Sequence, residues 1–146
     1  SKLYSEVVGL LGPAWGENGS LIIKSLESLM ERRPNKNCYL ASQQLGLATN
    51  EISRVETSFV HRNAVWKPWV TASWEAGDEQ DRMKSLSWLE EVWKTLKPTC
   101  PGIHLAQMHQ HLHWHDNEIN CAFEEWLPDL RKLKSELDPR GILPRL

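Results

Sequence analysis

The run 102–115 is the part of the sequence best suited to chemistry. At its end, between 109 and 115, four histidines alternate with other residues. If that run is extended, its two-residue period places all four imidazoles on one face. Imidazole transfers protons near neutral pH and is the commonest metal ligand in proteins. A metal site is the weaker interpretation, because a closed site needs a further ligand from another element. The nearest acids, Asp116 and Glu118, can equally be residues that begin a helix. The candidate metal ligands are His109, His111 and His113, and the fourth histidine of the row is His115.

His104 has the opposite parity, and the same extended run would place it on the other face with Met108, Leu112 and Trp114. A partly desolvated imidazole is biased toward its neutral form, which is the form that a general base needs. His104 is therefore a candidate catalytic base, and Met108 and Trp114 are candidate substrate contacts. The alternative is a half-buried histidine bonded to a backbone carbonyl.

Eight tryptophans are unusual in a chain of 146 residues. A ring of this size either anchors a core or walls a pocket, and the sequence leaves both roles open. In the alternating run 64–75, Trp66 and Trp74 share a face and Trp69 lies on the other. All three are candidate substrate-binding residues. Their parity predicts that at least one ring meets a second layer, a partner or a ligand.

The order of the expected elements predicts an α+β fold, with helices packed on one face of an antiparallel sheet in a single domain, 1–146. Pro68 interrupts the strand 64–75 and predicts an edge strand or a bulge. The expected helices are 3–11, ended by Gly12-Pro13, then 20–33, 78–97 and a last one from about 117 or 121, and the expected strands are 38–47, 64–75 and one from 103.

Several stretches resemble the C-terminal region of FAD-linked oxidases of the berberine-bridge-enzyme type, over about 54–146. The stretches are Thr57-Ser58-Phe59-Val60-His61-Arg62, then Pro101-Gly102-Ile103-His104-Leu105-Ala106, and finally Leu137-Asp138-Pro139. The resemblance implies part of the family's substrate-binding domain, a sheet laid over the flavin ring. It makes His61 a second catalytic candidate and Arg62 a substrate-binding candidate, although the family keeps this pair mainly to position a strand.

The sequence departs from the family at two positions and in its length. His104 stands where the family keeps a tyrosine, often its base, and Ala106 stands where it keeps an asparagine beside the flavin. The family's N-terminal FAD-binding domain is missing, and the scattered glycines form no phosphate-binding loop. We therefore expect no cofactor in this chain, and FAD only if a missing N-terminal domain is supplied.

Composition excludes several kinds of partner. A net charge of −2 without a basic stripe argues against nucleic acid. No apolar run is long enough to cross a membrane, no signal peptide is visible, and three cysteines without metal spacing indicate reduced thiols. These features predict a cytoplasmic protein that binds a hydrophobic small molecule. Because a partial sheet leaves an open edge, we also expect a homodimer.

Three functions remain open. The first is a free-standing, shortened relative of these oxidases that catalyses a non-redox cyclisation or isomerisation of a hydrophobic metabolite in secondary metabolism. The second is the C-terminal, substrate-binding fragment of a true FAD-dependent oxidoreductase. The third is a non-catalytic binding or interaction module whose tryptophans form a protein interface.

Overall fold

The computed structural model describes residues 2–144 and 146. Four strands form one antiparallel sheet in the order β2-β3-β1-β4. The strands are β1 (Leu3–Leu11), β2 (Tyr39–Gln44), β3 (Trp66–Glu75) and β4 (Gly102–Ile103). The α-helices are α1 (Gly19–Glu31), α2 (Glu79–Leu96), α3 (His115–Phe123) and α4 (Leu127–Leu137). Short 3-10 turns are η1 (Gly16–Asn18), η2 (Leu47–Glu51), η3 (Leu105–Gln107) and η4 (Glu124–Trp126).

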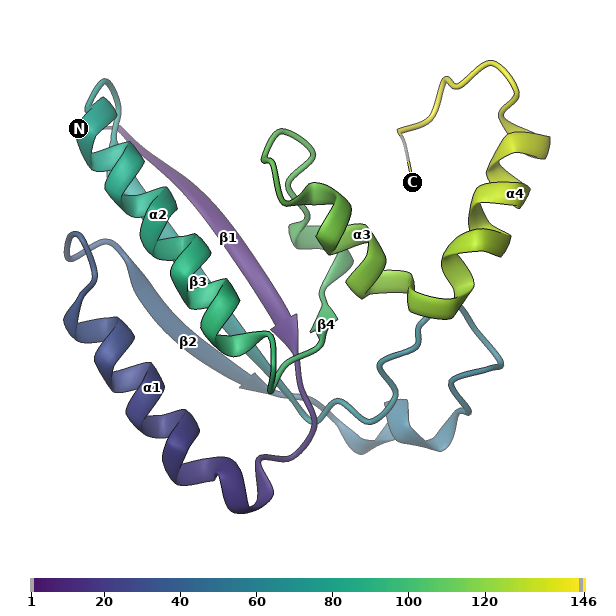
Figure 1. Cartoon of the computed structure of the whole chain (residues 1–146), viewed down its shortest axis with the longest axis horizontal. Coiled ribbons are helices and arrows are strands. Elements are labelled where there is room, and N and C mark those ends of the chain that lie inside the picture. The colour runs from purple at the N-terminus through teal and green to yellow at the C-terminus, as the bar shows by residue number, and fades with distance from the viewer. Residues whose placement is uncertain (1, 145) are drawn as a thin grey trace.

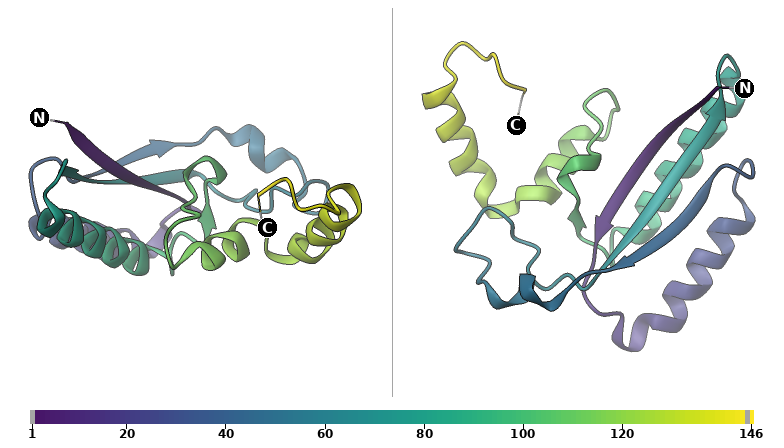
Figure 2. Two further views of the ribbon diagram at one scale, coloured as in Figure 1. Left: turned by 90° about the horizontal axis from the view of Figure 1, so that it is seen from above. Right: turned by 180° about the vertical axis from the view of Figure 1, so that it is seen from behind.

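Helices α1 and α2 lie along one face of the sheet, and Figure 2 (left) shows both on the same side of the strands. Within the described residues, no α-helix covers the opposite face. This arrangement confirms the predicted α+β class. The predicted helices at 20–33 and 78–97 and the strands at 38–47 and 64–75 are also confirmed, with bounds that differ by a few residues.

The two faces of β3 have different chemistry. Val70 and Ala72 point toward the helices and belong to the core with Leu89 and Val92 of α2. Because side chains alternate along a strand, the residues on either side of Val70 and Ala72 point to the opposite, uncovered face. The β3 residues of that uncovered face are Lys67, Trp69, Thr71 and Ser73.

The first segment is a strand and not the predicted helix. Tyr4 to Gly9 of β1 run antiparallel to Trp74 to Trp69 of β3, so β1 occupies the middle of the sheet. A short apolar run such as Val7 to Leu11 has no period that separates a helix from a buried strand. Pairing with β3, which is distant in the sequence, decides its structure.

Pro68 lies in an inner strand, so the predicted edge position is wrong. Proline has no N–H for the ladder. The β1–β3 ladder stops at the Gly9–Trp69 pair and resumes only at a single Gly12–Trp66 bridge. Pro68 falls in that gap, where β1 turns to pair through Leu10 and Leu11 with β4.

The extended run predicted for 102–115 is wrong beyond its first residues. Only Gly102 and Ile103 pair with β1. The chain then forms η3 and a turn before α3 begins at His115, as Figure 1 shows between β4 and α3. The four histidines therefore share no strand face, and Met108 and Trp114 do not lie with His104.

The predicted C-terminal helix is divided in two. Glu124 has a φ of 44°, which ends α3, and Pro128 stands in the first turn of α4. Proline fits this position because the first N–H groups of a helix have no partner within it. Figure 1 shows α4 turned away from α3, at the end of the molecule opposite α1.

No described helix is both long and apolar enough to cross a membrane.

Candidate functional site

His104 lies on the uncovered face of the sheet, in line with Gly9 and Trp69. Its backbone N–H donates to the Gly9 carbonyl oxygen at 2.9 Å, and Gly9 is paired with Trp69. The three residues thus form one row across β3, β1 and the start of η3. The row has no side chain in its middle, because Gly9 has none.

Two long side chains fill the space above Gly9. A Cβ atom added there would lie 1.9 Å from Gln107 Oε1 and 2.9 Å from Lys67 Cε. Any larger residue at position 9 would have to displace both side chains. The absence of a side chain at Gly9 is therefore what brings Lys67 and Gln107 together between His104 and Trp69.

Three polar side-chain atoms on or beside this face are buried without a hydrogen-bond partner. They are Thr71 Oγ1, His104 Nδ1 and Gln107 Oε1. Thr71 is enclosed by its cross-strand neighbours Val7 and Tyr39. Buried polar atoms are nearly always paired, so unpaired ones grouped in one region call for a ligand or water.

The charges on this face favour a neutral imidazole. Burial lowers the pKa of Lys67, which is only 6% exposed and lies with Nζ 4.9 Å from the centre of the Trp69 ring. Burial, and secondly the positive charge of Lys67, lowers the pKa of His104 below its ordinary value. Both effects favour the neutral form of His104, although its neighbour is Lys67 and not the predicted Met108 and Trp114.

His61 and Arg62, the other polar candidates, have partners of their own. The ring of His61 lies over Gly102 and its Nε2 donates to the Cys121 carbonyl oxygen at 2.6 Å, which ties this loop to α3. Arg62 stacks on Phe59 and bonds Thr57. It lines a polar hollow of about 410 Å³ together with Asn50, Ile52, Ser53, Arg54, Val60 and Asn63.

The tryptophans divide as their parity predicts. Trp66 and Trp74 are buried on the helix-covered face, and Trp66 meets Trp15 edge to face at a centroid distance of 4.7 Å. Trp114 is buried in the core between the sheet and α3. Only Trp69, 36% exposed, lies on the face of His104. The structure thus places one of the four candidate rings on the same sheet face as His104, across Gly9.

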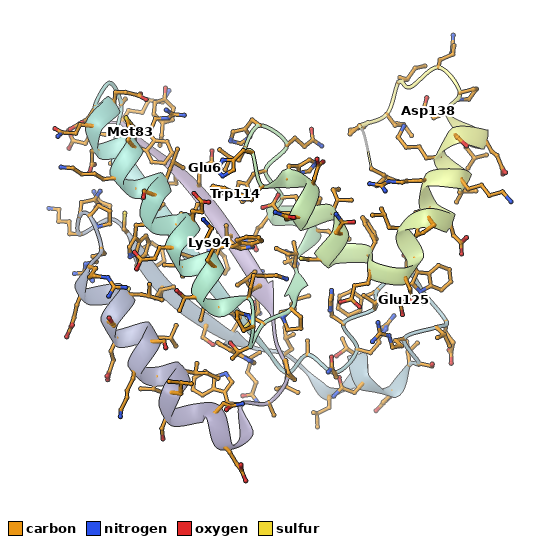
Figure 3. The ribbon with its side chains drawn as sticks, viewed as in Figure 1. Glu6, Met83, Lys94, Trp114, Glu125 and Asp138 are labelled. Carbon is orange, nitrogen blue, oxygen red and sulfur yellow. The ribbon has the colours of Figure 1, made fainter. Side chains whose placement is uncertain are left out.

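The histidine run forms a hydrogen-bonded cluster around Glu118, whose side chain is fully buried. Its carboxylate accepts from the His109 backbone N–H at 2.7 Å, His109 Nδ1 at 2.6 Å and Trp114 Nε1 at 3.2 Å. Burial raises the pKa of Glu118, but the hydrogen bonds from His109 outweigh it and lower the pKa overall. His111 bonds Glu6 of β1 at 2.7 Å, and Glu6 and Trp114, both labelled in Figure 3, lie where β1 faces the start of α3.

The cluster ties the turn after η3 to β1 and α3. It has no metal-binding arrangement: among residues 2–144 and 146, no group of three or more His, Cys, Asp or Glu side chains is placed to hold an ion. The three cysteines, Cys38, Cys100 and Cys121, are free thiols, as predicted.

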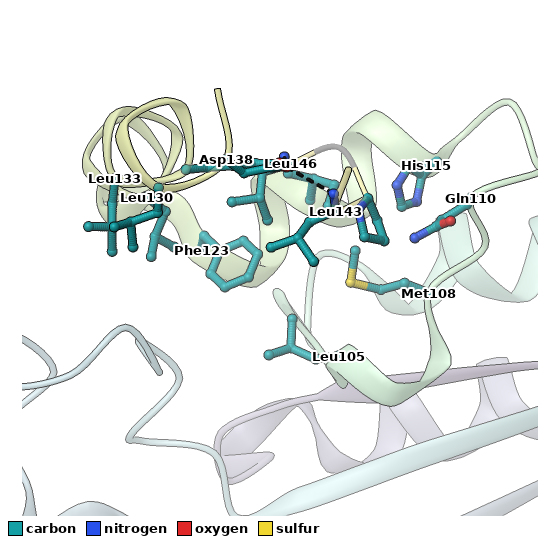
Figure 4. Close-up of a pocket in the computed structure, with 14 residues that line it drawn as sticks. Leu105, Met108, Gln110, His115, Phe123, Leu130, Leu133, Asp138, Leu143 and Leu146 are labelled. Atoms are coloured by element: carbon teal, nitrogen blue, oxygen red, sulfur yellow. Dashed lines mark hydrogen bonds and ion pairs between the residues drawn. The ribbon is translucent and has the colours of Figure 1, made fainter. Parts of the chain in front are cut away.

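Met108 belongs to a different feature, an apolar groove of about 570 Å³ between α3, α4 and the C-terminal turn (Figure 4). Leu130, Leu133 and Leu137 form one wall of the groove, and Leu105, Met108 and Phe123 form the other. His104, Trp69 and Lys67 are not among its lining residues.

Sequence reasoning missed Lys67, Thr71 and Gln107, and it considered Glu118 only as an acid near the histidine row or a residue that begins a helix. Lys67 and Thr71 share the parity of Trp69, so the alternating pattern of β3 could have placed them. Glu118 lies three and four residues after His115 and Trp114, which is the spacing of neighbours on a helix. Nothing in the sequence indicates that Gln107 folds back over Gly9.

Comparisons with known proteins give no sequence match. No protein-family model and no curated protein matches the chain. Solved structures do match: BBE-like 1 of Physcomitrella patens has a TM-score of 0.77 and 17% identity, over 99% of this chain and 30% of that chain. Berberine bridge enzyme from Eschscholzia californica has a TM-score of 0.69 and 17% identity, over 98% of this chain and 32% of that one.

BBE-like #28 from Arabidopsis thaliana agrees, with a TM-score of 0.72 and 16% identity over 96% of this chain and 32% of its own. The matches include the first fifty residues, which carry no sequence signature. The chain therefore has the fold of one part of the berberine-bridge-enzyme-like proteins, an antiparallel sheet with helices, and it spans about 30% of their length.

Proposed function

We propose that the uncovered sheet face binds a hydrophobic small molecule and that His104 transfers a proton in a non-redox isomerisation or cyclisation. The observation that carries this proposal is the ring of His104, whose Nδ1 is buried and unpaired beside Lys67. An unpaired ring nitrogen on a neutral imidazole is free to accept a proton. The fold alone supports no reaction, because one fold carries many functions.

The roles of the neighbouring groups follow from their chemistry. Trp69 offers an apolar surface on which a flat substrate can lie. His104 removes a proton from a carbon next to a carbonyl group, and the charge of Lys67 stabilises the oxygen anion that develops. The same imidazolium then returns the proton to a different carbon, which isomerises the substrate without any change in oxidation state.

Solvent deuterium incorporation tests this proposal even when the product is unidentified. The whole chain is incubated in D₂O with a panel of enolisable polyketide-, terpene- and alkaloid-like carbonyl compounds, and exchange at carbon is followed by NMR. We expect exchange with at least one compound, and a loss on the order of 10²–10⁴ in rate in His104→Ala.

His113→Ala is the matched control, because His113 is exposed and its contacts, with Glu90 at 3.3 Å and with the edge of the Trp114 ring, lie away from the uncovered sheet face. It should keep the wild-type rate. Equal rates for wild type and His104→Ala, with the fold intact by circular dichroism, would remove His104 as the base.

A second candidate function, the substrate-binding part of a longer FAD-dependent oxidoreductase, is favoured by the partial coverage of the matched structures. The described residues do not fit the diphosphate of FAD. Such groups bind at helix N-termini free of negative charge. Here the first turns of α2, α3 and α4 carry acids, and Glu17 precedes α1; the first-turn acids are Glu79, Asp81, Asp116, Glu118 and Asp129.

Flavin titration tests whether this chain by itself contributes to flavin binding, as the second candidate allows. We expect the purified chain to be colourless and to leave the fluorescence of added FAD without a saturable change. Saturable binding below about micromolar, a free energy near −8 kcal/mol, would favour the oxidoreductase part over a free-standing catalyst.

A further inference from the structure

Lys67 is largely buried, at 6% exposed, and has no counter-ion among the described residues. No ion pair joins it to any described carboxylate, whereas Arg32, Arg54, Arg82, Lys94 and Lys134 each have one. Its contact with Trp69 is a cation–π interaction, which supplies only part of the energy that an anionic partner provides. Partial desolvation of a charge that has no anionic partner is costly, and a carboxylate ligand would lower that cost.

Further groups that bind anions lie beside the Lys67 amine. The Gln107 side-chain amide lies over Gly9 next to Lys67 Cε, and its buried end has no partner. Since the oxygen and nitrogen of an amide are assigned from their hydrogen bonds, a ligand oxygen at this point would be met by the NH₂ group. His104 Nδ1 and Thr71 Oγ1 are the other unpaired atoms in this region.

We propose that Lys67, with Gln107 and His104, forms a subsite for the carboxylate of an organic-acid substrate whose apolar body lies on Trp69. This inference rests on the proposed function, since it names the substrate class for the same sheet face. A carboxylate has two oxygens and accepts several hydrogen bonds, so one oxygen bonds Lys67 Nζ and the other bonds the Gln107 amide.

The orientation that follows suits the proposed chemistry. A carboxylate bound to the ends of the Lys67 and Gln107 side chains, which themselves cover Gly9, would place the adjoining carbon atoms between His104 and Trp69, because these residues flank Gly9 in the same row. The acidic proton then lies beside the imidazole, and the ligand charge neutralises Lys67. We expect binding to weaken as salt is added, because a partly exposed ion pair is screened.

Paired ligands test the subsite. Acetate, phenylacetate, cinnamate and hexanoate are each compared with the corresponding neutral amide, by saturation-transfer NMR and calorimetry on the whole chain. At least one carboxylate should bind about tenfold more tightly than its amide, which corresponds to one charged hydrogen bond.

Substitutions of Lys67 test whether its charge binds the carboxylate. Lys67→Met, which keeps the volume, should remove the preference for the carboxylate, and Lys67→Arg should keep part of it. Lys132→Met, on the exposed face of α4, is the matched control and should bind like wild type. A preference that survives Lys67→Met, or the absence of a Lys67-dependent preference in every pair, overturns the inference.

The subsite and the reaction can fail separately. Carboxylate preference that depends on Lys67, without any His104-dependent deuterium exchange, would keep the subsite and reject the proposed catalysis. Exchange that depends on His104, with equal binding of carboxylates and amides, would keep the catalysis and reject the subsite.

Discussion

The charge of Lys67 acts on His104, and this effect is the residue-scale basis of the candidate site. Burial lowers the pKa of both side chains, and the charge of Lys67 lowers that of His104 further. The neutral imidazole is therefore present over a wider pH range than in a free histidine. The family resemblance identified His104, but the sequence could not place Lys67 near it, because the two residues lie on either side of Gly9, in β3 and just before η3.

Removal of the Lys67 charge should raise the pKa of His104. In Lys67→Met, the repulsion between two cations is lost while the burial of His104 remains, so its pKa should rise toward, but not above, the ordinary value near 6.5. A pH titration of the imidazole signals by NMR measures the change. Lys132→Met should leave it unchanged, and an unaltered pKa in Lys67→Met would show that the two groups do not interact.

Glu118 is the side chain on which the turn after η3 depends. Replacement by alanine would leave His109 and Trp114 with buried donors that have no acceptor. We expect Glu118→Ala to lower the free energy of unfolding by about 3 kcal/mol, the usual cost of breaking a buried charged network. Urea denaturation measures this change. Asp116→Ala, exposed on the same helix, should cost far less, and equal effects of the two substitutions would show that the turn does not depend on the buried carboxylate.

At the scale of elements, local pattern predicted the structure where each segment has a clear period and defined ends. Helix α2 has an Asp78 cap that accepts from the Asp81 N–H and a repeating apolar stripe, and it forms where predicted. Segment β1 has neither a cap nor a repeating apolar stripe, and its pairing with β3 determines its structure. The run after Ile103 fails for a similar reason, because Glu118, beyond the turn, bonds both the backbone and the ring of His109.

The C-terminal turn provides a prediction about pH. Asp138 accepts from Lys134 Nζ and from the backbone N–H groups of Ile142 and Leu143, and these bonds lower its pKa from 3.8 to about 2. A lowered pKa in the folded state stabilises the turn above the unfolded value of 3.8, and this stabilisation is lost as pH falls toward about 2.

Hydrogen exchange of the Ile142 and Leu143 amides tests the turn. Protection should decrease in Asp138→Asn at neutral pH, because the lost charge weakens three hydrogen bonds at once. Asp129→Asn, in the first turn of the same helix, should leave these two amides unchanged. Full protection in Asp138→Asn would mean that other contacts hold the turn.

At the scale of the whole molecule, two surfaces favour self-association. Strand β2 forms one edge of the sheet, and β4 pairs with only two residues of β1. Leu133 and Leu137 are exposed along the groove of α4. Open edges and apolar patches of this kind are usually covered by a partner.

We propose a homodimer on these grounds. Sedimentation at tens of micromolar should give a mass about twice 16.9 kDa. Leu133→Glu with Leu137→Glu should shift the mass toward the monomer if the groove is the contact, and should leave it unchanged if the β2 edge is. A single monomeric species in the wild-type protein would contradict self-association.

The position at which a ligand binds decides whether the uncovered sheet face is the functional site. In a ¹H–¹⁵N NMR titration with the carboxylic acid that binds most tightly, we expect shifts at the amides of Gly9, Lys67 and His104 and at the indole N–H of Trp69. The signals of the α4 groove, from Leu130 to Leu137, should stay in place. Shifts confined to that groove, with the uncovered sheet face unchanged, would contradict the assignment of the site.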